Sequence, residues 1–287
     1  MKILLTGCTG QVGYELERSL QGLGQVVAVD RSRMDLADLD RVRAVIREVR
    51  PGLIVNPAAY TAVDKAESEP ELAYRVNAEA PAVMAEEAKK LGAALVHYST
   101  DYVFPGDDPA PRVETDATGP INVYGASKLA GEQAIAASGV PHLIFRTSWV
   151  YGMRGKNFLL TMLKLARERD ELRIVADQHG APTWSRTIAD TTALVLANAM
   201  ARKDGGDWWR ENSGVYHLSS QGQTTWFDFT RAITELAGID CRLVPITSAE
   251  YPVPAKRPHY SALSSQKLIE RFCQLPDWKS ALELCLR

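Results

Sequence analysis

A glycine-rich turn lies between an apolar segment and an amphipathic segment near the N-terminus. We predict a strand at residues 2–6 and a helix at residues 11–23, joined by the spacing Gly7-x-x-Gly10-x-x-Gly13. Such glycines permit a tight turn and a close backbone approach to a pyrophosphate, which the free N–H groups of the following helix would bind. The turn therefore predicts a parallel α/β fold with a dinucleotide site.

The same alternation of apolar, strand-like segments and amphipathic, helix-like segments continues through the first half of the chain. Further strands are predicted at 26–30, 53–56, 94–100 and 142–146, helices at 39–50 and 127–137, and one or two helices within 70–91. This alternation is typical of a parallel sheet covered by helices on both faces.

The pattern changes after Tyr151. Helices are predicted at 157–169, 187–200 and 226–237, strands at 172–175 and 214–218, and an irregular loop at 245–258. We therefore expect an α/β, Rossmann-type doubly wound parallel sheet with a smaller C-terminal substrate-binding cap. The dinucleotide-binding domain would comprise residues 1–150 and about 184–220, and the cap residues 151–183 and 221–287.

Composition narrows the class of protein. The formal net charge of −2 gives no electrostatic reason to bind nucleic acid or a membrane surface, and no segment is long and apolar enough to span a bilayer. The four cysteines form no CxxC pair, and the five histidines are scattered. We expect a cytoplasmic protein with reduced thiols and no metal site.

Residues after the first three strands are candidates for cofactor binding. Asp30 ends the second predicted strand, where a carboxylate can hold ribose hydroxyls. Asp30 favours NAD(H), whereas Arg31 and Arg33 could neutralise the 2′-phosphate of NADP(H), so the sequence leaves this choice open. The candidates are Gly7, Gly10, Gln11, Val12, Gly13, Asp30, Arg31, Asp35, Leu36, Ala58, Ala59 and Tyr60. Asp35 could instead cap the helix predicted at 39–50.

Tyr124 and Lys128 form the predicted chemical site. Residues four apart share one face of a helix, and an ammonium group beside a phenol lowers the pKa of the phenol. A hydroxyl from Ser99 or Thr100, at the end of the strand predicted at 94–100, could hold a carbonyl oxygen. Together with a nicotinamide, this set can reduce a carbonyl group.

Several longer motifs indicate a family. They are Thr61-Ala-Val-Asp-Lys-Ala-Glu67, Ser99-Thr-Asp-Tyr-Val-Phe104, Arg146-Thr-Ser-Trp-Val-Tyr-Gly152 and Asp177-Gln-His-Gly-Ala-Pro-Thr183. With the glycine-rich turn and Tyr124-x-x-x-Lys128, the chain resembles the extended short-chain dehydrogenase/reductases, and within them the dTDP-4-dehydrorhamnose reductases. The resemblance runs from residue 1 to about 275.

The resemblance implies reduction of the C4 ketone of dTDP-4-dehydro-β-L-rhamnose with NADPH or NADH. It implies a catalytic triad of Thr100, Tyr124 and Lys128, of which Tyr124 and Lys128 would also contact the cofactor. The substrate would be bound by Thr61, Val63, Thr100, Asp101, Tyr102, Tyr124 and Trp149.

One position departs from the family pattern. Some members resemble dimers bridged by magnesium, and Glu15 matches one acidic position, but Arg186 stands where a second acid is expected. A cation there would repel the metal, so we expect a monomer or a metal-independent homodimer.

Two alternatives remain open at this stage. The chain also resembles NADP-binding regulatory subunits of methionine adenosyltransferase, although the intact Thr100, Tyr124 and Lys128 argue against a purely regulatory role. It could also be an epimerase or dehydratase acting on another nucleotide sugar.

Overall fold

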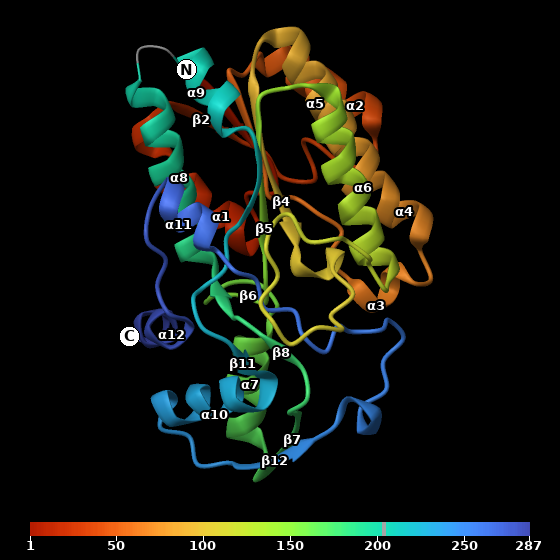
Figure 1. Cartoon of the computed structure of the whole chain (residues 1–287), viewed down its shortest axis with the longest axis vertical. Helices are drawn as coiled ribbons and strands as arrows, with labels where there is room; N and C mark the ends of the chain where they lie inside the picture. Colours follow the sequence, from red (N-terminus) through yellow and green to blue (C-terminus); the bar gives the residue numbers. More distant parts are fainter. Residues whose placement is uncertain (203–204) are drawn as a thin grey trace.

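The central element is a six-stranded parallel sheet. The computed structural model describes residues 1–202 and 205–287; residues 203–204, within the stretch 184–220 assigned to the sheet domain from sequence, lie outside the described residues. The strand order is β10-β5-β4-β3-β1-β2 (Figure 1). The strands are β1 (Lys2–Leu5), β2 (Gln25–Ala28), β3 (Leu53–Asn56), β4 (Ala94–Thr100), β5 (His142–Thr147) and β10 (Gly214–His217). The predicted α/β fold class is confirmed.

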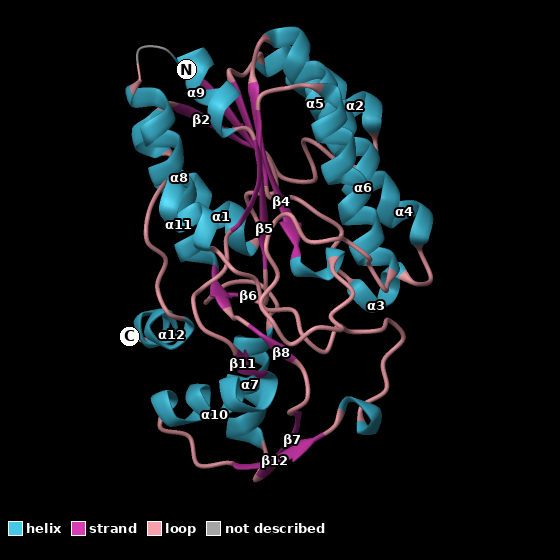
Figure 2. Cartoon of the chain, viewed as in Figure 1, coloured by secondary structure: helices cyan, strands magenta, loops and turns pink. Residues whose placement is uncertain are grey.

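Helices cover both faces of this sheet (Figure 2). Alternate strand residues point to opposite faces, so Ile3 and Leu5 join one core cluster and Leu4 joins the other. The first cluster is covered by α1 (Gln11–Ser19), α8 (Ser185–Ala201), α9 (Gly205–Asn212) and α11 (Gln266–Arg271). The second is covered by α2 (Leu39–Val49), α5 (Ala80–Leu91) and α6 (Val123–Ser138).

A third cluster lies below the sheet, as Figure 1 is drawn. It packs α7 (Phe158–Glu168), α10 (Trp226–Ala237) and α12 (Trp278–Leu286) against the parallel pair β7 (Glu171–Val175) and β12 (Arg242–Ile246). Two shorter pairs join this region to the sheet. They are β6 (Val150–Tyr151) with β9 (Thr183–Trp184), and β8 (His179–Gly180) with β11 (Thr224–Thr225).

Several predicted elements need correction. The helix predicted at 11–23 ends at Ser19, and a 3₁₀ turn, η1 (Gln21–Leu23), follows. The region 70–91, predicted as one or two helices, does contain two, α4 (Pro70–Tyr74) and α5, which a π-helical turn η2 (Arg75–Glu79) joins. The loop predicted at 245–258 was wrong at its start, because Pro245 and Ile246 belong to β12. Proline is tolerated there because β12 lies at the edge of a two-stranded pair.

The sequence patterns also missed short elements. These are α3 (Val63–Ala66), α9, α11 and α12, together with the two-residue strands. Elements of this length carry too little periodicity to be seen in sequence and depend on tertiary packing. Among the helices of residues 1–202 and 205–287, none has the length and apolar character needed to cross a bilayer.

Candidate active site

The glycine-rich turn has the geometry that its spacing predicts. Gly7 has φ of 57°, a left-handed conformation that favours glycine. A Cβ on Gly13 would lie 2.1 Å from the carbonyl oxygen of Gly7, so only glycine permits this approach of α1 to the turn. Gly10 is the N-cap residue of α1, and no side chain in the described part of the chain caps this helix end. Its N–H groups therefore remain available to an anion such as a phosphate.

A cavity of about 280 Å³ lies beside this turn. Eight predicted cofactor-binding residues line it, namely Gly7, Asp30, Arg31, Asp35, Leu36, Ala58, Ala59 and Tyr60. They come from the ends of β1, β2 and β3, at the point where the strand order reverses between β1 and β3. Open parallel sheets bind ligands at such a point. Lys65, Glu69, Leu72 and Val76 also line the cavity and were not identified from sequence.

Asp30 and Arg31 are held differently at the rim of this cavity. Asp30 Oδ1 accepts hydrogen bonds from the backbone N–H and hydroxyl of Ser32, at 2.9 and 2.6 Å. The Ser32 hydroxyl is the main reason why the pKa of Asp30 is lowered. Arg31 Nε donates to Asp35 Oδ2 at 3.0 Å, and its side chain is 81% exposed.

The alternative role considered for Asp35, capping the helix predicted at 39–50, is wrong. Asp38 is the N-cap residue of α2, and its carboxylate accepts from the backbone N–H of Arg41 at 2.9 Å. Asp35 accepts instead from the backbone N–H of Ala37, the largest cause of its lowered pKa. Its carboxylate therefore remains at the cavity.

The predicted chemical residues meet where β4 ends. Thr100 is the last residue of β4, and α6, which carries Tyr124 and Lys128, packs against β4. Asn122 caps α6 by accepting from the backbone N–H of Gly125 at 2.8 Å. Tyr102 meets Tyr124 edge to face, with the ring centroids 5.9 Å apart. The structure thus brings Thr100, Tyr102, Tyr124 and Lys128 to one edge of the sheet.

The electrostatics of Tyr124 correct one expectation. Burial and the nearby Asp101 carboxylate raise the pKa of Tyr124, and a hydrogen bond with Thr100 only partly offsets this. The lowering expected from Lys128 is absent because the ammonium group is engaged elsewhere. Lys128 Nζ donates to the backbone carbonyl of Tyr98 at 2.6 Å and lies 3.1 Å from His97 Nε2.

Lys128 is almost completely buried. Loss of hydration lowers the pKa of Lys128 to about 8, and Glu132, one turn further along α6, opposes this shift. Glu132 itself pairs with Arg146 of β5, with Arg146 Nη2 2.7 Å from Glu132 Oε2 and both side chains at most 5% exposed. Titration of Lys128 near neutral pH therefore results from burial.

A buried polar chain behind Lys128 was missed from sequence. His97 Nδ1 lies 3.1 Å from Asn56 Nδ2, and the Thr6 hydroxyl donates to Asn56 Oδ1 at 2.6 Å. All three side chains are at most 1% exposed. The available signal was a polar residue directly after β1 (Thr6), at the end of β3 (Asn56) and in the middle of β4 (His97). Asn77, in the π-helical turn η2, was also missed; it bonds the backbone of Tyr60 and the hydroxyl of Ser127.

The predicted substrate residues occupy three places. Thr61 and Val63 lie beside the cavity, where α3 begins. Asp101 is buried, accepts hydrogen bonds from Thr100 and Ser148, and has a pKa raised to about 6 by desolvation.

Trp149 has φ of 46°, a strained conformation for a bulky residue, and its ring stacks on that of Trp226 of α10, with the ring centroids 3.5 Å apart. Trp226 was not identified from sequence.

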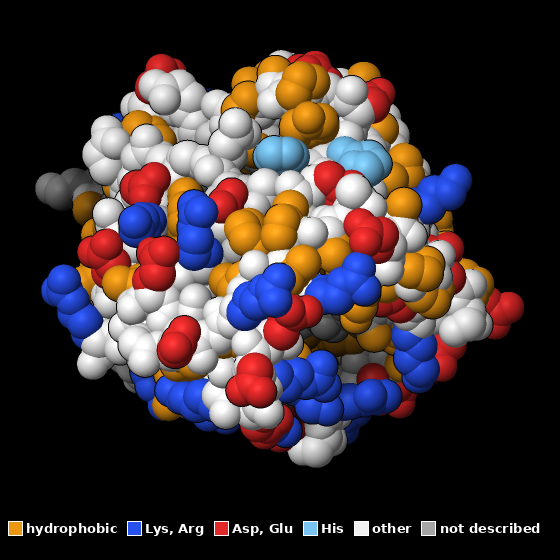
Figure 3. Space-filling view, turned by 90° about the horizontal axis from the view of Figure 1, so that it is seen from below, with side chains coloured by type: hydrophobic (Ala, Val, Ile, Leu, Met, Phe, Trp, Pro, Cys, Tyr) orange, Lys and Arg blue, Asp and Glu red, His pale blue; other side chains and the backbone are white. Residues whose placement is uncertain are grey.

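The C-terminal segment closes over the same edge of the sheet. Arg257 Nη2 pairs with Asp64 Oδ2 at 2.8 Å, and the backbone carbonyl of Lys256 accepts from Asn122 at 2.8 Å. On the end of the molecule formed by the cap, lysine and arginine side chains border a hollow near the centre of the face (Figure 3). Such a border attracts anions.

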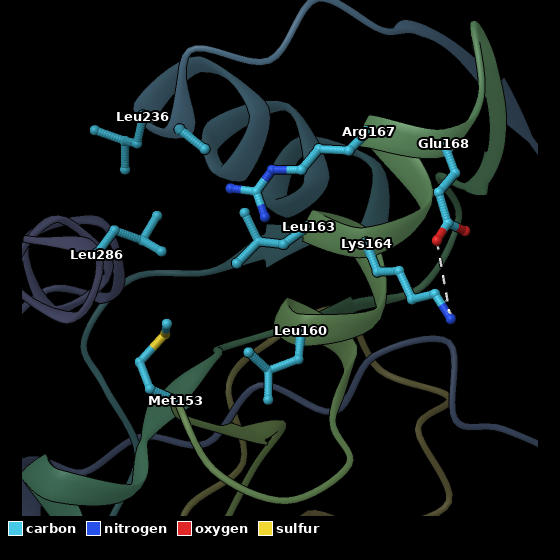
Figure 4. A pocket seen from close by; sticks show the side chains of 9 residues that line it. Met153, Leu160, Leu163, Lys164, Arg167, Glu168, Leu236 and Leu286 are labelled. Carbon is cyan, nitrogen blue, oxygen red and sulfur yellow. Dashed lines mark ion pairs between the residues drawn. The ribbon is translucent and has the colours of Figure 1, made fainter.

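A second cavity, of about 600 Å³, lies between α7, α10 and α12. Figure 4 shows Leu236 and Leu286 facing Leu163 across it, with Lys164 paired to Glu168 at the side. It is lined by Met153, Leu160, Leu163, Lys164, Arg167, Glu168, Leu236, Ala237 and Leu286. None of the predicted site residues is among them, whereas eight predicted cofactor-binding residues line the smaller cavity.

Glu15 and Arg186 lie on α1 and α8, which pack together. Arg186 Nε lies 3.6 Å from Asp190 Oδ2, on the same helix. In residues 1–202 and 205–287, no group of three or more His, Cys, Asp or Glu side chains is arranged to hold a metal ion.

A Rossmann-type parallel sheet, a glycine-rich turn and the Tyr124/Lys128 pair on α6 define an extended short-chain dehydrogenase/reductase. Comparison with known proteins narrows this class. The chain belongs to the RmlD substrate binding domain family, whose model matches residues 1–287. The predicted family is thereby confirmed.

Individual relatives match this chain over nearly the full length of both sequences. A dTDP-4-dehydrorhamnose reductase of Burkholderia thailandensis is 52% identical, with 100% of this chain and 98% of the relative covered. Another, of Escherichia coli K12, is 47% identical, with 100% and 97% covered. The solved dTDP-4-dehydrorhamnose reductase of Bacillus anthracis, in complex with NADP, is 37% identical, with a TM-score of 0.90 and 99% and 98% covered.

Proposed function

We propose that this protein is an NAD(P)H-dependent reductase of the C4 ketone of dTDP-4-dehydro-β-L-rhamnose, forming dTDP-L-rhamnose. The observation that carries the proposal is the meeting of Thr100, Tyr124 and Lys128 at the sheet edge in a chain 52% identical to a dTDP-4-dehydrorhamnose reductase. The cavity lined by the predicted cofactor residues supports it.

The residues present fit a nicotinamide dinucleotide. The start of α1 would bind the pyrophosphate through backbone N–H groups, while Asp30 and Arg31 would meet the adenosine ribose. The Bacillus anthracis relative was solved with NADP, which supports NADPH here, and NADH is the second candidate. When bound, the nicotinamide supplies the hydride that reduces the carbonyl carbon.

The side chains of the chain handle the carbonyl oxygen. Tyr124 would donate its phenolic proton to this oxygen, and the Thr100 hydroxyl would position it by a hydrogen bond. Lys128 would hold the nicotinamide ribose and stabilise the phenolate of Tyr124. Because the pKa of Tyr124 is raised in this structure, this role requires the N–H of Lys128 that contacts neither Tyr98 nor His97 to reach the phenol.

The cap would select the sugar nucleotide. Thr61, Val63, Asp101, Tyr102 and Trp149 are proposed to surround the deoxysugar, and the cationic border of the hollow in Figure 3 suits a diphosphate. We assign cofactor binding to residues 1–150 and about 184–220, and substrate binding to 151–183 and 221–287.

The proposal extends to location and assembly. The four cysteines are free thiols, which suits the cytoplasm. A monomer or metal-independent homodimer is proposed because Arg186 replaces the acid expected opposite Glu15. Light scattering with and without EDTA tests this, and a dimer that dissociates on chelation would refute it.

The activity is tested with purified protein, NADPH or NADH, and enzymatically prepared dTDP-4-dehydro-β-L-rhamnose. We expect one cofactor oxidised for each dTDP-L-rhamnose formed. Cofactor binding without turnover would indicate a regulatory subunit, and sugar conversion without net oxidation would indicate an epimerase. Either result would refute the proposed reductase activity.

A further inference from the structure

The starting observation is how the three N–H bonds of the Lys128 ammonium are used. One donates to the Tyr98 carbonyl oxygen at 2.6 Å, and His97 Nε2, 3.1 Å from Nζ, accepts a second when the ring proton lies on Nδ1. Both partners belong to β4. A lysine ammonium has three donors, so these two contacts leave the third for the cofactor and Tyr124.

The orientation of the His97 ring is set from behind. Nδ1 is in contact with the Asn56 amide of β3, and that amide is in contact with the Thr6 hydroxyl, directly after β1. These side chains lie on three neighbouring strands and are shielded from water. The ring therefore has a defined position, and its Nε2 can act as a fixed hydrogen-bond partner for Lys128.

The charge of Lys128 is linked to the His97 tautomer. A charged ammonium requires a lone pair on Nε2, so the ring proton must lie on Nδ1 and be accepted by the amide oxygen of Asn56. With the Asn56 nitrogen towards Nδ1, as the amide is placed here, Nε2 carries the proton and suits a neutral Lys128 amine. A half-turn of the amide exchanges these two patterns without moving the ring, and the Thr6 hydroxyl then accepts from the amide instead of donating to it.

Glu132 favours the charged form of Lys128, but no carboxylate in the described part of the chain forms a hydrogen bond with the ammonium. Glu132 faces Lys128 from α6 but is engaged by Arg146 of β5 through three hydrogen bonds. Asp101, from the 3₁₀ turn η3 (Asp101–Val103), acts on Tyr124 and Tyr102. Asn56 and Thr6, which face His97, are uncharged. His97 itself stays neutral because burial and Lys128 lower its pKa well below its usual value.

We propose that His97, held by Asn56 and Thr6, is a positioning residue that keeps Lys128 charged and directs its remaining N–H towards the cofactor and Tyr124. This inference rests on the proposed function of Lys128. Loss of the His97 acceptor would destabilise the ammonium relative to the amine. The active form would then be lost at lower pH than in the wild type.

Two substitutions of similar size separate the functional contact from the structural contact. The amide of His97→Gln can reach the place of Nε2 and accept from Lys128, whereas the shorter amide of His97→Asn reaches only the place of Nδ1 and bonds Asn56. We expect His97→Asn to lower kcat/KM for the keto sugar by about 10- to 100-fold at pH 8, as expected for loss of a hydrogen bond to a charged group. His97→Gln should restore most of the rate.

The pH profile provides the readout that a purely structural role would not change. In His97→Asn the alkaline fall of kcat/KM should begin about one pH unit lower than in the wild type, whereas His97→Gln should follow the wild type. Thermal melting of each variant checks folding. An equal loss of kcat/KM in both variants, or an alkaline fall of kcat/KM that is not shifted in His97→Asn, would overturn the proposal.

Binding of NADPH, followed by its fluorescence, tests the inference without the sugar. NADPH binding should weaken as the pH rises, and we expect this weakening to begin at a lower pH in His97→Asn than in the wild type. The difference should vanish in a Lys128→Met background, because the two residues act as one unit. Additive effects would refute the coupling. If the wild type binds NADPH but does not reduce the keto sugar, the proposed function fails while this cycle still decides the role of His97.

Discussion

The two ends of the predicted cofactor site are built in opposite ways. At the chemical end, Lys128 and His97 are at most 2% exposed, and loss of hydration lowers the pKa of both side chains. At the adenosine end, the Arg31 side chain is 81% exposed and pairs with Asp35 across a 3.0 Å contact. Here, hydrogen bonds to neighbouring groups are the main cause of the lowered pKa values of Asp30 and Asp35.

This difference shows where single residues have most influence. A buried charge interacts strongly with its neighbours because little water screens it, whereas an exposed ion pair contributes at most about 1 kcal/mol. A single substitution at the chemical end should therefore change activity or stability strongly, and one at the adenosine end should change them only slightly.

The largest effect is expected for Tyr124→Phe. This variant removes the proton donor and keeps the ring, so kcat should fall by about 100- to 10,000-fold while NADPH still binds. Steady-state turnover and cofactor fluorescence measure the two quantities. Tyr216→Phe, which loses another buried hydroxyl on β10, is the matched control and should keep most of the activity. A fully active Tyr124→Phe enzyme would remove Tyr124 from the mechanism.

Glu132→Gln compares buried and exposed ion pairs directly. It leaves Arg146 buried without its counter-charge, and we expect a loss of about 3–5 kcal/mol in the free energy of unfolding. Glu168→Gln breaks an exposed pair with Lys164, whose atoms are 3.9 Å apart, and should cost less than about 1 kcal/mol. Urea denaturation of both variants measures this difference, and equal losses would contradict the role of burial.

The rate should also fall in alkaline solution. The pKa of Lys128 is lowered from 10.5 to about 8, so the ammonium is present below pH 8 and is lost above it. If the ammonium is the active form, kcat/KM should decrease by about tenfold per pH unit above pH 8. A profile that stays flat to pH 10 would show that burial does not set the charge of Lys128.

The smallest effect is expected at the exposed end. Arg31→Ala removes a cation from the cavity rim and should reduce the preference for NADPH over NADH by only about three- to tenfold, less at high salt. Arg33 is tied to Glu48 at 3.0 Å, so Arg33→Ala serves as the control and should change the preference less. The ratio of kcat/KM values for the two cofactors is the measurement; a stronger effect of Arg33→Ala would reverse this assignment.

Much of the sheet domain follows from local sequence patterns. Strands β3 and β4 and helix α10 have the predicted limits, because their apolar periodicity and their flanking residues agree. The expected change in the pKa of Tyr124 failed for a non-local reason. Helical spacing correctly brings Lys128 to the face of Tyr124, but it carries no information about Tyr98 and His97, which contact the Lys128 ammonium.

The sequence by itself determined the parallel sheet, the glycine-rich turn and the placement of Tyr124 and Lys128 on one helix. These depend on backbone geometry over a few residues, which periodicity and glycine spacing record. Only the tertiary structure decided the charge of Lys128, its contact with His97 and the stacking of Trp149 on Trp226. Those properties depend on burial and on partners 31 to 77 residues away, and folding brings these groups together without a local signal.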